Sequence, residues 1–294
     1  MKLTTSNAGL PMAFIILYGS GFIGTKYGLS YANPLSFLSW RFFLASVILL
    51  LLALVTSNLN KHSFKNSAHI AVAGLLTVGL FSIGVFESMA IGMSPALSAL
   101  IIALQPIFIG ILAKRVVGET LSRLQWLGLV LGLIGVAWVV YDNIEFDSVG
   151  LASVALSVLG LFSLTAGNLY QKKFCSNMNL FVGGAIQSFV SALACILLLL
   201  LISEYRVLWS GEFVLALGYM TIGVSVGALS LLYLMIRYGS LSKVASLFYL
   251  VPVVAALASY FFLNETFSSV TVVGIVIVVM GLLLANHSKG DNEK

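Results

Sequence analysis

The sequence predicts an all-α integral membrane protein in which ten transmembrane helices form two inverted five-helix repeats. Three observations lead to this fold class. Hydrophobic residues make up 60% of the chain and charged residues only 9%, whereas soluble domains carry about 25% charged residues. Ten apolar segments are each long enough to cross about 30 Å of hydrocarbon. Residues 1–146 and residues 147–294 also share their rarest features in one register, which predicts one five-span repeat in each range.

The ten apolar segments fill nearly the whole chain. They are about 9–26, 34–57, 68–91, 95–113, 122–141, 149–171, 179–202, 212–236, 241–262 and 268–286. Asn33-Pro34 and Ser94-Pro95 each place a capping side chain before a proline at the first helical position, so they predict where the second and fourth helices begin. Ser122 and Gln125 have the spacing of a capping box at the start of the fifth. No connection is long enough to form a soluble domain.

The repeat becomes visible when the chain is shifted along itself by 146 residues. Pro106 then falls on Pro252, and Glu119-Thr120 falls on Glu265-Thr266. The chain has only 5 prolines and 10 acidic residues in 294 positions, so these coincidences indicate a tandem duplication. Further coincidences are Gly21 with Gly167, Lys26 with Lys172, Asn33 with Asn179 and Gly128 with Gly274. Because five is odd, the second repeat is inverted, as in transporters that alternate access between two faces.

The basic residues indicate the orientation in the membrane. With the N-terminus placed inside, twelve basic residues fall in inward segments, whereas only Lys26 and Arg206 fall in outward segments. Cytoplasmic loops of membrane proteins carry this excess of lysine and arginine. We therefore expect a multi-pass protein of the cell inner membrane with both termini in the cytoplasm. The net charge of +5 orients the chain in a lipid bilayer and does not indicate a nucleic-acid partner.

Pro106 and Pro252 lie in the middle of the fourth and ninth predicted spans. A proline inside a helix lacks the amide hydrogen and displaces the carbonyl four residues earlier, here at Ile102 and Phe248. Freed carbonyls in a bilayer need new partners, and broken helices in transporters often line the substrate cavity. The two kinks are therefore expected either to shape the helices or to line a cavity.

Arg41 and Glu87 are charged residues well inside predicted spans. Counted from the ends of their spans at 1.5 Å per residue, both lie in the same outer leaflet and could pair. Intramembrane ionisable residues are functional candidates because an unpaired charge at depth is costly. Two interpretations stay open: a structural ion pair, or a substrate-binding group together with a group that carries a coupling proton.

Other polar residues are candidates for gates or for a binding pocket. Glu119 and Glu265 follow the fourth and ninth spans at opposite faces, where each could cap a helix or form a gate contact. A metabolite pocket needs a few polar groups among apolar and aromatic walls, although tyrosines near span ends are often interface anchors. The polar side chains within spans are Tyr18, Gln105, Asn168, Tyr170, Gln187, Tyr233 and Tyr249.

Signatures of enzymes and metal sites are missing from the sequence. His62, His69 and His287 fall in connections or in the tail, and no histidine, cysteine or carboxylate cluster has metal-ligand spacing. A phosphate-binding loop of the Gly-Lys-Ser/Thr type is also missing. We therefore expect no catalytic residues, no metal and no cofactor. An intramembrane enzyme and a non-transporting membrane subunit remain as alternatives from other functional classes.

These features together resemble the drug/metabolite transporter superfamily, in particular its EamA-type bacterial members. The resemblance rests on Gly19–Lys26, on Pro34 with Arg41, and on the runs Pro106–Glu119 and Pro252–Glu265 with the glycine-bearing helix after each. It covers nearly the whole chain. It implies secondary transport of a small organic metabolite by alternating access. Members of the superfamily export amino acids, take up vitamins such as riboflavin, or move other metabolites.

The charge content of the spans bears on the substrate. Gln187 stands in the second repeat where the first has Arg41, so the cation is not shared by both halves. Aromatic residues make up 12% of the chain. A charge-poor, aromatic cavity favours a neutral, ring-bearing solute such as riboflavin over a zwitterion, and export of amino acids or related metabolites is the alternative.

Overall fold

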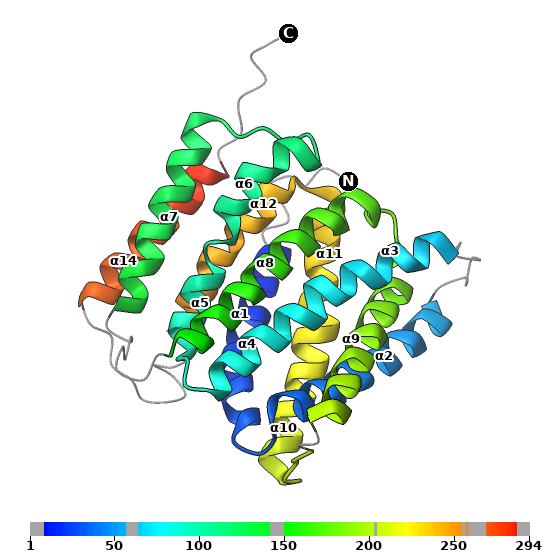
Figure 1. Ribbon diagram of the computed structural model, residues 1–294. Coiled ribbons are helices and arrows are strands. Elements are labelled where there is room, and N and C mark those ends of the chain that lie inside the picture. The colour runs from blue at the N-terminus through cyan, green and yellow to red at the C-terminus, as the bar shows by residue number, and fades with distance from the viewer. Residues whose placement is uncertain are drawn as a thin grey trace.

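The computed structural model describes residues 9–56, 64–141, 150–202, 205–254, 257 and 269–286, and within them the regular elements are helices. The first half contributes α1 (Gly9–Leu29), α2 (Pro34–Thr56), α3 (Phe64–Gly74), the π-helix η2 (Leu75–Leu80), α4 (Phe81–Ala90), α5 (Pro95–Ile102), α6 (Gln105–Val116) and α7 (Arg123–Tyr141). The second half contributes α8 (Leu151–Phe174), α9 (Leu180–Ile202), α10 (Gly211–Tyr219), the π-helix η4 (Met220–Ala228), α11 (Leu229–Tyr238), α12 (Leu241–Ser246), the 3₁₀-helix η5 (Leu247–Tyr249) and α14 (Ser269–Ala285). Figure 1 shows these helices gathered into one bundle.

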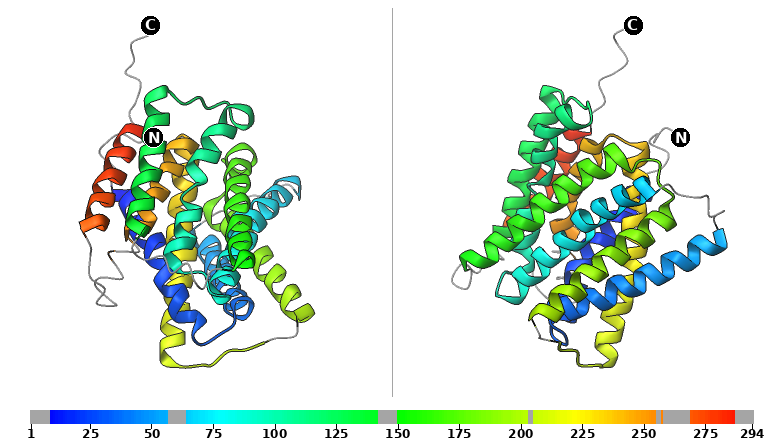
Figure 2. Two further views of the ribbon diagram at one scale, coloured as in Figure 1. Left: turned by 60° about the vertical axis from the view of Figure 1, so that its left-hand side comes forward. Right: turned by 45° about the vertical axis from the view of Figure 1, so that its right-hand side comes forward.

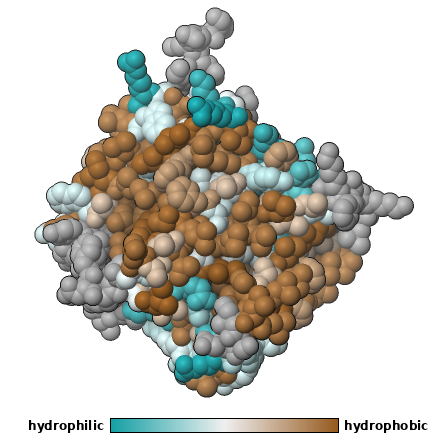
Figure 3. All heavy atoms as spheres, in the orientation of Figure 1, coloured by the Kyte–Doolittle hydropathy of each residue, from teal (hydrophilic) through white to brown (hydrophobic). Residues whose placement is uncertain are grey.

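Six helices of the described chain are long enough and apolar enough to cross a membrane. They are Pro34–Thr56, Asn66–Ala90, Leu97–Val116, Leu151–Phe174, Leu180–Leu201 and Gly211–Tyr238. Three shorter apolar helices cover Arg123–Val139, Leu241–Val254 and Ser269–Ala285. Figure 3 shows hydrophobic side chains over the middle of one face, as expected for a surface that meets lipid. The described chain is therefore a helical membrane protein, and the crossing of all ten segments stays a prediction.

The predicted helix starts are confirmed where their caps are described. Ser94 Oγ accepts a hydrogen bond from Leu97 N at 3.2 Å, and Asn33 Oδ1 accepts one from Ser36 N at 3.1 Å. Ser122 and Gln125 form the reciprocal capping box, with distances of 2.9 and 3.2 Å.

The predicted breaks at both prolines are also confirmed. The helix of the fourth segment stops at Ile102 and restarts at Gln105, which puts Pro106 in the first turn of α6. In the ninth segment α12 passes into the 3₁₀-helix η5 shortly before Pro252. Both breaks lie just before the proline, because its ring leaves no room for the carbonyl of the preceding turn.

The fifth segments of the two halves, α7 and α14, pack side by side and run antiparallel (Figures 1 and 2). Gly128 of α7 lies against the backbone of Gly281 and Ala285, whereas Gly135 lies against Gly274. Later residues of α7 therefore contact earlier residues of α14, which is the pattern of antiparallel helices. A Cβ at Gly128 would stand 2.3 Å from the Ala285 amide nitrogen. Glycine is therefore required here for the two backbones to approach.

Other helices also pair across the halves. Extensive contacts join α2 with α9, α1 with η4, and α4 and η2 with α8. The two π-helices, η2 and η4, occupy corresponding places when the chain is shifted by 146 residues. The bundle has two ends, which we name by the residues at their connections. The Asn33 end holds residues 30–33, 91–94 and 205–210, and the Glu119 end holds residues 117–122, 175–179 and 239–240.

Candidate substrate pathway

A cavity of about 490 Å³ opens at the Asn33 end, which we call the vestibule. Its walls come from the ends of α1 and α4 and from the connections beside them. The lining residues are Lys26, Leu29, Ser30, Ala32, Asn33, Pro34, Met89, Ala90, Gly92, Met93 and Arg206. Lys26 and Arg206 are both exposed and give the vestibule positive charge. Such an entrance concentrates anions near its mouth.

A second cavity, of about 40 Å³, lies beneath the vestibule along the same helices and is bordered by Arg41. Its lining residues are Tyr18, Gly21, Phe22, Thr25, Arg41, Phe81, Ser82, Val85, Phe86, Met220 and Val224. On both α1 and α4 the residues of this Arg41 cavity precede those of the vestibule within a turn or two. The Arg41 cavity holds a few waters at most in this state, so a metabolite would need its walls to separate.

The Arg41 side chain is held in place inside the bundle. It is only 5% exposed, and its Nε donates a hydrogen bond to Ser225 Oγ of η4 at 2.8 Å. Its guanidinium carbon lies 5.2 Å from the ring centroid of Phe42 and 5.8 Å from that of Phe86. A guanidinium has five donors, and those not used by Ser225 suit bidentate binding of a carboxylate.

Glu87 follows Phe86 on α4 and is half-buried. The Cys195 thiol of α9 lies within electrostatic range of both Glu87 and Arg41, which places the two charges in one region of the bundle. This agrees with the common depth that span counting indicates. Direct pairing of Arg41 with Glu87 stays a prediction.

Several buried polar atoms have no hydrogen-bond partner among the described residues. They are Nε2 and Oε1 of Gln105, Oδ1 of Asn168, Oε1 of Gln187, Oγ1 of Thr221 and the hydroxyl of Tyr233. Buried polar groups in folded proteins are nearly always bonded to protein, water or ligand. Gln105 directly precedes Pro106 at the broken helix, so the break and an unpartnered amide occur at one place. All but Thr221 belong to the polar span residues that the sequence singles out.

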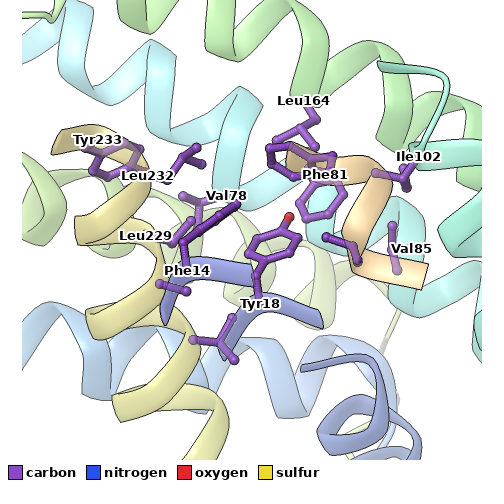
Figure 4. Packing of buried hydrophobic residues seen from close by; sticks show 14 of the residues in the cluster. Phe14, Tyr18, Val78, Phe81, Val85, Ile102, Leu164, Leu229, Leu232 and Tyr233 are labelled. Atoms are coloured by element: carbon purple, nitrogen blue, oxygen red, sulfur yellow. The ribbon is translucent and has the colours of Figure 1, made fainter. Parts of the chain in front are cut away.

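The two tyrosines predicted as substrate contacts occupy different surroundings. Tyr18 lines the Arg41 cavity and stacks on Phe81 with 6.5 Å between ring centroids (Figure 4). Tyr249 is fully buried, and its hydroxyl donates to the Leu129 carbonyl at 2.8 Å while its ring packs on Gly132. The structure therefore gives Tyr249 a contact between η5 and α7, whereas Tyr18 remains beside a cavity.

Glu119 caps a helix of the other half of the chain. Its Oε1 accepts a hydrogen bond from Leu241 N at 2.7 Å, and its Oε2 accepts from Ser242 N and Ser242 Oγ, both at 3.0 Å. A carboxylate at the first turn of a helix meets unpaired amides and the positive end of the helix dipole. The hydrogen bonds by which Glu119 caps α12 thus also join the first half of the chain to the second. Beside it lies a hollow of about 330 Å³ that Glu119 and Lys243 help to line. Glu265, its counterpart in the repeat register, lies outside the described residues.

Lys172 forms a second tie at the Glu119 end. Its Nζ donates to the carbonyls of Ile236 and Gly239, at 2.8 and 2.7 Å, where α11 ends. Arg237 adds a hydrogen bond from Nε to the Ser176 carbonyl at 2.6 Å. Neither residue was assigned a functional role from the sequence, and the coincidence of Lys26 with Lys172 in the repeat register was the one signal that could have found Lys172.

The two lysines in this register have different surroundings. Ile236 and Gly239, which Lys172 binds, correspond to Ala90 and Met93 at the other end. Ala90 and Met93 line the vestibule together with an exposed Lys26. Within the second half, α8 is thus bound to the end of α11 at the Glu119 end, whereas the corresponding residues of the first half border a cavity at the Asn33 end.

Among the described residues, no group of three histidine, cysteine or acidic side chains is placed to hold a metal ion. Apolar helices that pair across the two halves and enclose a cavity with a buried cation define a multi-pass membrane protein of the transporter class. The profile of the EamA-like transporter family matches residues 8–141 and again residues 151–287. The chain belongs to this family.

Individual relatives agree with this assignment. The chain is 27% identical to "Uncharacterized transporter YvbV" of Bacillus subtilis (strain 168), over 97% of this chain and 93% of that protein. It is 28% identical to "Probable amino-acid metabolite efflux pump" of Salmonella typhimurium (strain LT2), over 94% and 93%. A solved structure described as "Crystal structure of protein" superposes with a TM-score of 0.79 at 16% identity, covering 96% of this chain and 97% of that one, and so shares the fold. The two sequence relatives carry the names of a transporter and an efflux pump and not of enzymes.

Proposed function

We propose that this protein is a secondary transporter of the cell inner membrane that moves a small carboxylate-bearing metabolite of the amino-acid type. The observation that carries the proposal is the buried Arg41, which borders a cavity directly beneath a positively charged vestibule. The positive charge of the vestibule would attract an anionic group, and the Arg41 guanidinium would bind it. The efflux pump among the relatives supports the same substrate class.

Alternating access would follow from exchange between two inverted repeats, residues 1–146 and 147–294, with ten spans in all. The antiparallel pairing of α7 with α14 supports the inversion. In the present state the Lys172 and Glu119 contacts hold the Glu119 end together. In the opposite state Lys26 would bind the carbonyls of Ala90 and Met93, and the contacts of Lys172 would open. One set of interactions replaces the other, which allows the two states to have similar free energies.

The orientation of the proposed cycle rests on the basic residues. Lys114, Arg115, Arg123, Lys172, Lys173, Arg237 and Lys243 lie toward the Glu119 end, whereas Lys26 and Arg206 lie at the Asn33 end. By the positive-inside rule the Glu119 end faces the cytoplasm. The structure then corresponds to an outward-open state, with the vestibule facing the outside of the cell and both chain termini in the cytoplasm.

A neutral, ring-bearing solute such as riboflavin is the second candidate. One observation favours it: the Arg41 cavity is bordered by the aromatic rings of Tyr18, Phe22, Phe81 and Phe86. Such rings stack on a planar solute. The amino-acid type stands first because its carboxylate would use the guanidinium donors of Arg41, which a neutral vitamin does not require.

Counterflow in proteoliposomes that contain the purified full chain tests the function. Vesicles loaded with single amino acids, related metabolites or riboflavin are mixed with trace labelled solute. We expect accumulation for a carboxylate-bearing solute, and a loss of about tenfold or more in Arg41→Gln because a charge-assisted contact is removed. Equal uptake by protein-free vesicles for every solute would contradict the proposal. Riboflavin counterflow that Arg41→Gln leaves intact would favour the second candidate.

A further inference from the structure

A second polar cluster stands where the 146-residue register places the counterpart of the Arg41 cavity. The corresponding residues are Phe22 and Asn168, Thr25 and Gln171, Arg41 and Gln187, and Glu87 and Tyr233. We name Asn168, Gln171, Gln187 and Tyr233 the amide cluster. The Arg41 region carries charges of both signs, whereas all four side chains of the amide cluster are neutral.

Two helices of the second half bring the amide cluster together. Gln187 Nε2 of α9 donates a hydrogen bond to Gln171 Oε1 of α8 at 2.8 Å. Asn168 precedes Gln171 by three residues on α8, so the two side chains share a face of the helix. α11, which carries Tyr233, contacts both α8 and α9.

The third segment of the first half forms the opposite wall of the cluster. A Cβ at Gly74 would lie 2.4 Å from Gln187 Cβ, and a Cβ at Gly167 would lie 2.5 Å from Thr77 Cγ2. Gly74 and Thr77 are one turn apart, so one face of this segment covers the cluster. The Tyr233 hydroxyl lies beside the Thr77 hydroxyl, which donates to the Ala73 carbonyl at 2.8 Å and keeps its oxygen as an acceptor. Figure 4 shows Tyr233 apart from Tyr18, beyond Leu229.

The amide cluster is buried and incompletely satisfied. Asn168, Gln187 and Tyr233 are 1%, 0% and 4% exposed. Oδ1 of Asn168, Oε1 of Gln187 and the Tyr233 hydroxyl have no hydrogen-bond partner of ordinary geometry among the described residues. The amide oxygens require a donor, and the hydroxyl can donate as well as accept. Unpartnered atoms of this kind in one cluster indicate a site for a polar group.

We propose that the amide cluster binds a neutral amide or imide group of the transported solute, an inference that rests on the proposed function. The N–H of such a group donates to Asn168 Oδ1 and Gln187 Oε1, while its carbonyl accepts from the Tyr233 hydroxyl. A protonated amine is disfavoured because none of the four side chains supplies a countercharge. The group has two sources, the carboxamide of an amino acid such as glutamine and the ring imide of a flavin.

Two matched ligand pairs test this site by thermal unfolding of the purified full chain and by counterflow. L-Glutamine is compared with L-norvaline, which lacks the amide, and riboflavin with its N3-methyl derivative, which lacks the imide hydrogen. We expect the wild type to prefer the amide or imide member of one pair by about tenfold, as the loss of a hydrogen bond to a buried group predicts. The pair that shows the preference identifies the source.

In the variants Asn168→Leu and Gln187→Leu, the two members of that ligand pair should bind and be transported about equally. The unliganded unfolding midpoint of Asn168→Leu should rise, because an unpartnered buried oxygen is removed, whereas that of Gln187→Leu should fall, because Gln171 Oε1 loses its donor. Thr221→Val is the matched control, since Thr221 is also buried with an unpartnered hydroxyl but stands outside the cluster. It should raise the midpoint and leave the preference unchanged.

Two results would overturn the inference: a wild type that prefers neither member of either pair, and a preference that survives in both variants. Either result is separate from failure of the proposed function. If norvaline is transported and Arg41→Gln abolishes that transport, the transporter assignment stands and only the amide site falls. If none of the four solutes is bound or moved, the amide site is overturned, and counterflow with the full panel of amino acids and related metabolites decides the proposed function.

Discussion

At the scale of single residues, the buried cation Arg41 is the basis of the proposed function. Arg41 is surrounded by aromatic rings and by the Ser225 hydroxyl, and Glu87 lies in the same region. Its counterpart Gln187 needs no countercharge and instead bonds to Gln171. Two positions that correspond in the 146-residue register therefore carry different chemistry. Sequence alone located both residues, but the neighbours of each came only from helix packing.

The first prediction concerns Arg41 and Glu87. If they form only a structural pair, Arg41→Met or Glu87→Gln alone leaves a buried charge and costs about 3–5 kcal/mol, and the double change costs less. Membrane abundance and activity would then recover together in the double variant. If Glu87 carries a coupling proton, downhill counterflow survives in Glu87→Gln but accumulation against a solute gradient does not.

Accumulation driven by a pH gradient, measured in both single variants and in the double variant, separates these outcomes. Full gradient-driven uptake by Glu87→Gln would eliminate Glu87 as the proton carrier.

At the scale of elements, the close approach of helices and the hydrogen bonds at helix ends hold the bundle together. α7 and α14 touch through their backbones at Gly128 and Gly135. The Glu119 end is held by a carboxylate on the first turn of α12 and by Lys172 on the last carbonyls of α11. Such ties are polar and local, so they can open without unpacking the helices.

The second prediction concerns helix approach. Gly128→Ala places a Cβ 2.3 Å from the Ala285 amide nitrogen, so α7 and α14 must separate, at a cost of about 1–3 kcal/mol. Gly218→Ala is the control, because a Cβ there meets no atom within 4 Å and alanine favours a helix. Thermal unfolding in detergent should show a lower midpoint for the first variant only. Equal midpoints would contradict the backbone contact.

The third prediction concerns the Lys172 tie. Lys172→Met removes two charge-assisted hydrogen bonds, so the Glu119 end should open more often. The buried Cys175 at that end reports opening, in a Cys195→Ser background. Maleimide labelling of Cys175 in inside-out vesicles should become about tenfold faster. Lys173→Met, a change at the exposed neighbouring lysine, should leave the rate unchanged. Equal labelling of both variants would remove Lys172 from the proposed gate.

At the scale of the whole molecule, corresponding contacts differ between the two ends. The Asn33 end holds a cavity of about 490 Å³, whereas the Glu119 end is tied across the halves. In the proposed cycle of two inverted repeats, such a difference between the two ends is what alternating access requires. The distribution of basic residues is the basis for the proposal that the Glu119 end faces the cytoplasm.

The fourth prediction is topological. Reporters fused after Lys294 or inserted within residues 61–66 should read as cytoplasmic, and one inserted near Asn143 should read as external, because basic residues are retained inside. Paired alkaline phosphatase and fluorescent protein fusions measure this. A cytoplasmic signal at Asn143 would contradict both the ten-span topology and the inversion.

Sequence alone determined the membrane class, the positions of the helices and the helix breaks, because these depend on local composition, on capping residues and on proline chemistry. The 146-residue register also singled out Pro106, Pro252 and Lys172 before any contact was known. Only the tertiary structure decided which polar groups are satisfied. The Tyr249 hydroxyl donates to the Leu129 carbonyl, and the Glu119 carboxylate accepts from the first turn of α12. The side-chain oxygens of Asn168 and Gln187 have no hydrogen-bond partner among the described residues. These hydrogen bonds join helices that are far apart in the chain, so the residue type at one position does not identify the residue that it contacts in the fold.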